Sequence, residues 1–282
     1  QNEFLENRTF DQATRQTEVR SALESLRLVV WLRSLIGQDV ESFKESTGQE
    51  LPENVTARLD EESGYASYHW DPEWKRQVTK QYKESLQRII EQCKSSNIPL
   101  VFVCLGSNLR DCPPFKSELP PDLATKDKQD FHSLFAQATE LADQPEAALN
   151  RYEQCLEISD QYALLHFRLG RTLEQLGESQ SARHHYLLAK DLDICPLRLS
   201  EKMDNIQRAL AQQHNIPLVD ARNTLESASA DKIPGYEMYV DHVHPTLHGH
   251  QMIARAIVDE LMENKLVIPH RNLDTQDLSL IH

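Results

Sequence analysis

The sequence lacks the features of a membrane-spanning or disulfide-stabilised protein. No stretch approaches the roughly 18 consecutive apolar residues of a transmembrane helix, so we expect no membrane span. The chain has five cysteines, an odd number, and no two of them are spaced as Cys-x-x-Cys. The sequence therefore predicts neither a disulfide framework nor a structural zinc site.

Positive charge is also scarce. Lys and Arg together number 30 against 44 for Asp and Glu, which gives a formal net charge of -14. Because nucleic acids and anionic membranes bind basic surfaces, this balance argues against both as partners. The composition is otherwise that of an ordinary globular protein, with 39% hydrophobic and 26% charged residues.

Two short apolar runs predict strands of a parallel sheet. Residues 99–105 and 216–220 are almost continuously apolar, which is the pattern of a strand covered on both faces. Amphipathic spacing predicts helices on either side of these runs, and Asp71 followed by Pro72 predicts an N-cap for one of them. The predicted helices cover residues 17–36, 72–93, 200–214, 221–230 and 245–264.

The middle of the chain contains an internal repeat with a period of 34 residues. Aligning its two units brings Ala148 onto Ala182 and Tyr152 onto Tyr186. Small residues let paired helices approach closely, and aromatic rings fill the space between them. The pattern resembles the tetratricopeptide repeat (TPR), which implies two helix pairs. The two units are residues 129–162 and 163–196.

These patterns predict a helix-rich α/β domain that is interrupted by an all-α, TPR-like insertion. A doubly wound sheet usually has about five or six strands, and the sequence offers two. We therefore expect the N-terminal strands to lie outside this chain. The predicted segments are 1–128 and 197–269 for the two parts of the α/β domain, 129–196 for the insertion and 270–282 for a polar tail.

The most informative motif is Asp241 with His244 and Pro245. An Asp three residues before a His can accept a hydrogen bond from one ring nitrogen and leave the other nitrogen free as a base. The motif resembles the last sequence block of the SGNH (GDSL-like) hydrolases. In that family an Asp-x-x-His-Pro turn completes a Ser-His-Asp triad on a flavodoxin-like, three-layer fold.

A second resemblance to this family lies at the start of the chain. Gln1, Asn2 and Glu3 are similar to the end of the family's Gly-x-Asn-Asp block, with Glu3 in place of Asp. The resemblance implies that Asn2 donates a hydrogen bond to the oxyanion. It also implies that the nucleophilic serine lies upstream of Gln1, in agreement with the missing strands and with a chain that begins without Met.

From the resemblance we expect a fragment of a serine esterase or acyl (acetyl) hydrolase. Its substrate in the parent protein would be a small ester or an O-acylated carbohydrate, and no cofactor or metal is implied. His244 would be the base, Asp241 would orient it, and the fragment alone would be inactive. The sequence does not indicate a cellular location.

Three further candidates follow the first predicted strand. Ser107, Asn108 and Arg110 stand at its carboxyl end, where α/β folds bind ligands, and we predict that they contact substrate. Arg110 has two interpretations, contact with an anionic substrate group or pairing with Asp111. Ser107 is the alternative nucleophile within the chain, although its neighbours do not form a Gly-x-Ser-x-Gly elbow.

Other interpretations of the chain stay open. His244 could be a structural residue, or it could join neighbouring histidines in a metal site. The repeats could form a peptide-binding module on a non-catalytic scaffold, with Arg168, Arg171 and Arg183 as basic contacts. An incomplete sheet would also expose a strand edge, through which the fragment could form a homodimer. The neighbouring histidines of the alternative metal site are His242, His248 and His250.

Overall fold

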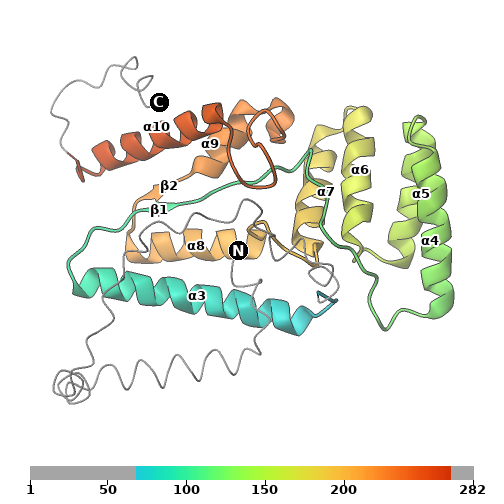
Figure 1. Cartoon of the computed structure of the whole chain (residues 1–282), viewed down its shortest axis with the longest axis horizontal. Helices are drawn as coiled ribbons and strands as arrows, with labels where there is room; N and C mark the ends of the chain where they lie inside the picture. The colour runs from blue at the N-terminus through green and yellow to red at the C-terminus, as the bar shows by residue number, and fades with distance from the viewer. Residues whose placement is uncertain (1–67, 268–282) are drawn as a thin grey trace, which may run out of the picture. The chain divides into compact units, whose positions relative to one another are not determined.

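A computed structural model describes residues 68–267 of the chain. The helix predicted over residues 17–36, the candidate Asn2 and the polar tail 270–282 lie outside the described residues. The described part is rich in helix, as expected, with eight α-helices and two short strands (Figure 1). Their bounds are α3 Pro72–Ser95, β1 Phe102–Val103, α4 Thr125–Glu140, α5 Pro145–Ile158, α6 Ala163–Gln175, α7 Ser179–Leu192, α8 Glu201–His214, β2 Leu218–Val219, α9 Ala221–Ala228 and α10 Leu247–Glu263, with a 3₁₀ turn, η2, at Ala230–Lys232.

The two strands pair in parallel, as the sequence predicts. Phe102 lies opposite Leu218, and Val103 lies opposite Val219. Each strand spans two residues, far fewer than the predicted runs 99–105 and 216–220. The parallel pairing is therefore confirmed, while the predicted strand lengths are wrong.

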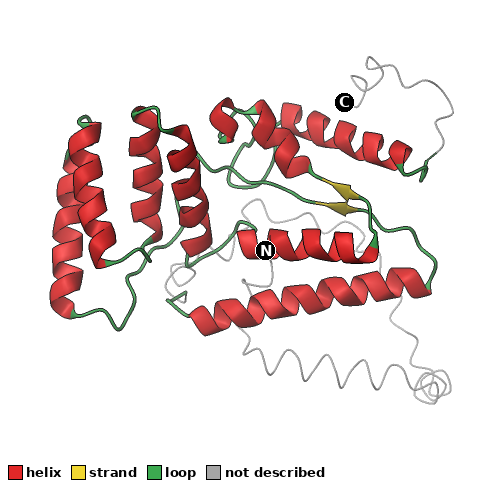
Figure 2. Cartoon of the chain, turned by 180° about the vertical axis from the view of Figure 1, so that it is seen from behind, coloured by secondary structure: helices red, strands yellow, loops and turns green. Residues whose placement is uncertain are grey.

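Helices cover both faces of this strand pair (Figure 2). Phe102 packs with Ile90 of α3 and Leu210 of α8 on one face. Val103 points to the other face, where it packs against the buried cluster that contains Leu225 and residues of α10. Alternate side chains of a strand point to opposite faces, so neighbouring residues of β1 enter two different apolar layers.

Local side chains set the beginnings of the helices. The Asp71 carboxylate accepts the Trp74 N–H at 2.8 Å and caps α3 as predicted. The last helix was predicted to begin at Pro245, which is wrong by two residues. Pro245 instead forms a β-bridge with Tyr239, and the Thr246 hydroxyl caps α10 by accepting the Gly249 N–H at 3.1 Å.

The 34-residue period of the sequence reappears in the helix bounds. Helix α5 runs from residue 145 to 158 and α7 from 179 to 192, so both ends are displaced by 34 residues. Each of these helices packs against the one before it, α5 against α4 and α7 against α6 (Figure 1). In the second pair, a Cβ added to Gly170 would lie 2.9 Å from the Tyr186 ring, so only glycine leaves room for that ring.

Partly buried ion pairs join the second helix pair to α8 and α9. Glu201 binds Lys190 of α7 at 2.6 Å and Arg222 of α9 at 2.8 Å. Arg222 also reaches Asp204 at 3.1 Å and Glu226 at 2.7 Å. A network of this kind fixes the mutual geometry of the three helices, because breaking one partner leaves an uncompensated charge in a buried place.

Two histidines, the buried His166 of α6 and the partly buried His185 of α7, lie side by side. His166 is 3% exposed, and its Nε2 lies 2.8 Å from the Asp160 carbonyl oxygen, which can only accept. The Nδ1 of His166 must then accept from the Nδ1 of His185, 2.9 Å away. Burial lowers the pKa of both rings, and with the neighbouring His166 and His184 it lowers the pKa of His185 to about 4.

Within residues 68–267, no helix combines the length and the apolar character needed to cross a membrane.

The variant Gly170→Ala tests the close approach of α6 and α7. Overpacking against the Tyr186 ring costs about 1–3 kcal/mol, whereas alanine gains up to about 1 kcal/mol of helix propensity, so we expect a net loss of about 1–2 kcal/mol in unfolding free energy. Urea denaturation measures it. Arg168→Ala, at an exposed position of the same helix, is the control and should change stability by less than about 0.5 kcal/mol. A variant of unchanged stability would contradict the packing.

Acid pH should destabilise the protein through the His166–His185 pair. Between about pH 6.5 and 4 the unfolded chain binds a proton at His185 and the folded chain does not, so stability falls as pH is lowered through that range. In His185→Gln the unfolding free energy should depend less on pH. The loss between about pH 6.5 and 4 should be smaller than in the original protein by on the order of 1–2 kcal/mol. His132→Gln, at an exposed site of α4, should keep the original slope. Thermal unfolding at several pH values distinguishes the two.

Candidate active site

Asp241 and His244 form a hydrogen-bonded pair in the turn that precedes α10. The Oδ2 of Asp241 lies 2.6 Å from the Nδ1 of His244. Its Oδ1 accepts the backbone N–H groups of Val243 at 2.9 Å and His244 at 2.8 Å. One carboxylate therefore binds both the backbone of the turn and the imidazole, which fixes the ring relative to the chain.

The charge state of Asp241 decides the tautomer of His244. Partial burial opposes ionisation of Asp241, but the hydrogen bonds from the backbone of His244 and Val243 and from the imidazole outweigh it and lower the pKa to about 2. An ionised carboxylate only accepts hydrogen bonds, so Nδ1 of a neutral His244 carries the proton and Nε2 carries the lone pair.

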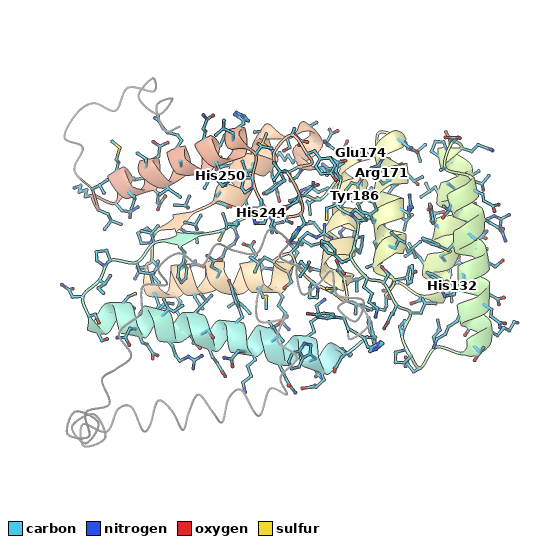
Figure 3. The ribbon with its side chains drawn as sticks, viewed as in Figure 1. His132, Arg171, Glu174, Tyr186, His244 and His250 are labelled. Carbon is cyan, nitrogen blue, oxygen red and sulfur yellow. The ribbon has the colours of Figure 1, made fainter. Side chains whose placement is uncertain are left out.

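The basic nitrogen of His244 is open to a reactant. The side chain is 70% exposed, and Nε2 has no hydrogen-bond partner among residues 68–267. Figure 3 shows His244 in the loop that leads to α10, away from the helix pair that carries His132. An oriented imidazole with a free nitrogen is the arrangement of a general base.

The loop after β1 holds this turn in place through backbone hydrogen bonds. The Asn108 N–H donates to the His242 carbonyl at 3.0 Å. Two further N–H groups of the loop, those of Leu109 and Arg110, donate to the Pro234 carbonyl at 2.9 and 3.1 Å. The side chain of Asp111 accepts the Tyr236 N–H at 2.9 Å. Residues 108–111 thus support the whole segment from Pro234 to His242.

The turn itself is closed by short antiparallel contacts. The Val240 N–H donates to the His244 carbonyl at 2.8 Å, and the Thr246 N–H donates to the Met238 carbonyl at 2.9 Å. These bonds pair the chain on either side of Asp241 and His244. The two side chains therefore project from a small, closed hairpin and not from an open loop.

A second histidine, His242, lies beside the Asp241–His244 pair. The His242 ring meets the Phe115 ring edge-on, with centroids 5.2 Å apart, and its Nδ1 lies 3.7 Å from Asp241. Burial lowers the pKa of His242, although the Asp241 carboxylate raises it. Sequence reasoning considered His242 only as a metal ligand and missed its packing on Phe115, because nothing local in the sequence connects positions 115 and 242.

The three candidates after β1 go to different places. Asn108 is fully buried at the turn, with its side-chain oxygen accepting the Asp111 N–H at 2.9 Å and its Nδ2 unpaired. Ser107 is buried and lines a cavity of about 10 Å³ beside Asp204 and Arg222. This volume suits a single water molecule. Of the three, Asn108 is the one that directly binds the His244 turn.

Arg110 pairs with residues of α6 and η2. Its Nε lies 2.7 Å from Glu174 of α6, and its Nη2 donates to the Ala230 carbonyl at 2.9 Å. Asp111, which the sequence offered as its partner, lies instead within 4.0 Å of Arg171. Figure 3 shows Arg171 and Glu174 together on α6, beside Tyr186 of α7. The substrate contact predicted for Arg110 stays a prediction.

The chemistry of the site follows from its donor set. Within the described residues, no three or more His, Cys, Asp or Glu side chains gather closely enough to hold a metal ion. His248 and His250 both lie exposed on α10. The site offers a carboxylate, an oriented imidazole and a free ring nitrogen, which suit proton transfer to and from a hydroxyl group or water.

Comparisons with known protein families, with curated proteins and with solved structures give no match to this chain.

Replacing Asp241 by Asn should change the tautomer of His244. The amide can present its N–H₂ or its oxygen to Nδ1, so the ring loses its strict preference for a proton there. The ¹⁵N chemical shifts of the two ring nitrogens, measured at a pH at which the ring is neutral, report the tautomer directly. We expect the contrast between protonated Nδ1 and bare Nε2 in the original protein, and a smaller contrast in Asp241→Asn. Identical shifts in both proteins would show that the carboxylate does not orient the ring.

Proposed function

We propose that this chain is the C-terminal part of an SGNH-like esterase or acyl hydrolase that carries a TPR-like helical insertion. The observation that supports this best is the Asp241–His244 pair, joined at 2.6 Å with the second ring nitrogen exposed. It has the spacing and the geometry of the Asp and His in an Asp-x-x-His-Pro block. The function is esterase chemistry, with His244 as base and Asp241 as its orienting partner.

The fold around the pair agrees with this proposal. Two parallel strands lie between helices on both faces, as in a three-layer α/β domain. The turn that carries His244 binds the loop at the carboxyl end of β1, the end at which open α/β sheets bind ligands. The matching bounds of α5 and α7 favour two TPR-like units between the two halves of this domain.

In the proposed reaction, a serine upstream of Asn2 attacks the carbonyl carbon of an ester. His244 Nε2 takes the hydroxyl proton as the Ser–carbonyl bond forms, and Asp241 stabilises the resulting imidazolium. Asn2 and backbone N–H groups bind the oxyanion. His244 then gives its proton to the leaving alcohol as the ester C–O bond breaks.

The second half of the reaction releases the acid. A water molecule attacks the acyl-serine and passes its proton to His244, and the serine oxygen leaves with that proton from the imidazolium. This sequence consumes one water and one ester and yields one acid and one alcohol. A small ester or an O-acylated carbohydrate suits an exposed histidine of this kind, since the reacting bond is reached from solvent.

The helical insertion takes a supporting part in this proposal. Lys190 of α7 shares Glu201 with Arg222, and Arg183 of the same helix pairs with Glu226. Arg183 is therefore already bound, and it is a poor candidate for a peptide carboxylate. These contacts favour an insertion that is fixed on the α/β domain and shapes its site over an independent peptide-binding module.

The first test uses the chain as it stands. A fluorophosphonate probe should not label it covalently, and p-nitrophenyl acetate should not be turned over above the rate of an equal concentration of free imidazole. The reason is that the proposed nucleophile precedes Asn2. Mass spectrometry locates any label. A label on Ser107 would contradict the upstream serine and place the nucleophile within the chain.

The second part of the test uses a longer chain that includes the serine-bearing segment. In it, His244→Ala should lower kcat for the ester by about 10³-fold or more, because the general base is lost. The matched control is His250→Ala, an exposed histidine on α10 that lies outside the turn. Equal activities in the two variants would contradict the assignment of His244.

A further inference from the structure

Arg198 is a buried cation for which the proposed reaction gives no role. Its side chain is 2% exposed, in the segment that leads from α7 to α8. Its Nη1 donates to two backbone carbonyls, those of Asn108 at 3.0 Å and Cys112 at 2.8 Å. These two carbonyls bracket residues 109–111, a short segment of the loop after β1. One planar guanidinium group therefore holds both ends of that segment.

The same loop holds the His244 turn. The Asn108 N–H donates to the His242 carbonyl at 3.0 Å. Arg198 thus binds the backbone carbonyl of Asn108, and the turn binds the backbone N–H of the same residue. A displacement of Asn108 would move the His242 carbonyl, and with it the backbone on which Asp241 and His244 meet.

A second route leads from Arg198 to the turn through Asp193. The Asp193 carboxylate, 1% exposed, lies 3.7 Å from Arg198 Nη2 and accepts the N–H groups of Phe115 at 2.8 Å and Lys116 at 3.1 Å. The Phe115 ring in turn packs edge-on against His242. Asp193 directly follows α7, so the pair stands where the helical insertion rejoins the α/β domain.

Stability alone explains this pair poorly. A buried ion pair usually contributes little net stability, because desolvation of both charges offsets their attraction. In this case two further nitrogens of Arg198, Nε and Nη2, are buried without a hydrogen-bond partner. Buried unpaired donors are costly, and they persist where the arrangement serves another purpose. Geometric control of the loop is a purpose that fits the contacts.

We propose that Arg198 is a positioning residue for His244, acting through Asn108 and, by way of Asp193, through Phe115. The role rests on the proposed function, in which His244 is the base. Arg198 binds both carbonyls through Nη1 while its Nη2 faces Asp193, and the single nitrogen of a lysine cannot occupy both positions. Loss of the clamp should therefore misplace the imidazole without removing it.

The test compares Arg198→Lys with Arg222→Lys. The Arg222 side chain is 11% exposed and makes several ion pairs, but it makes no hydrogen bond to residues 107–112, so Arg222 is a matched control for general destabilisation. In the chain as it stands, ¹⁵N shifts of the His244 ring nitrogens should change in Arg198→Lys and stay constant in Arg222→Lys. In the longer chain, Arg198→Lys should lower kcat by up to about 100-fold with little change in KM.

Each outcome decides the proposal. Unchanged His244 shifts in a folded Arg198→Lys variant would overturn it, and so would equal changes in both variants. Changed shifts in Arg198→Lys alone support it. If the longer chain shows no hydrolysis while these shifts change, the proposed function fails and the structural clamp stands.

A measurement on the unchanged protein keeps the proposal testable if Arg198→Lys does not fold. The Asn108 N–H should be protected from hydrogen exchange by at least about 10³-fold, because it is buried and bonded to His242. Exchange at the rate of an exposed loop amide would show that Asn108 does not hold the turn and would overturn the proposal.

Discussion

The candidate active site depends on the hydrogen bond from the Asn108 N–H to the His242 carbonyl. Asp241 and His244 bind each other within four residues, but a local turn alone does not hold a fixed place on a protein surface. The bond to Asn108 attaches the turn to the strand pair, through a loop that leaves β1 and binds residues from Pro234 onward. A hydrogen bond inside such a network is worth more than an isolated one, since each member fixes the geometry of the next.

Charged groups join α7, the last helix of the second helix pair, to the elements around this site. Lys190, Glu201 and Arg222 link α7 with α8 and α9. Asp193 and Arg198 bind the loop after β1. Helix α7 is therefore attached to α8, α9 and the loop after β1 by polar contacts, in addition to apolar packing.

Much of the secondary structure could be predicted from local sequence patterns. The N-cap of α3 and the positions of the two strands follow from residues close together in the sequence, and the 34-residue period reappears in the bounds of α5 and α7. The Asp241–His244 bond is equally local, with a spacing of three residues. Contacts between distant segments were not predictable. The sequence offered Asp111 as a partner for Arg110, yet Arg110 binds Glu174, because packing of α6 against the loop brings that carboxylate closer. Arg198 had no local signal at all, since its partners lie near positions 108 and 112.

The most direct test of the account is a crystal structure of the longer, serine-bearing chain after reaction with a fluorophosphonate. The account predicts a phosphonylated serine with its Oγ within about 3–4 Å of His244 Nε2, and an intact hydrogen bond between His244 Nδ1 and Asp241. A label on a serine far from His244, or an imidazole turned away from Asp241, would contradict the central claim that this pair is the base of a serine hydrolase.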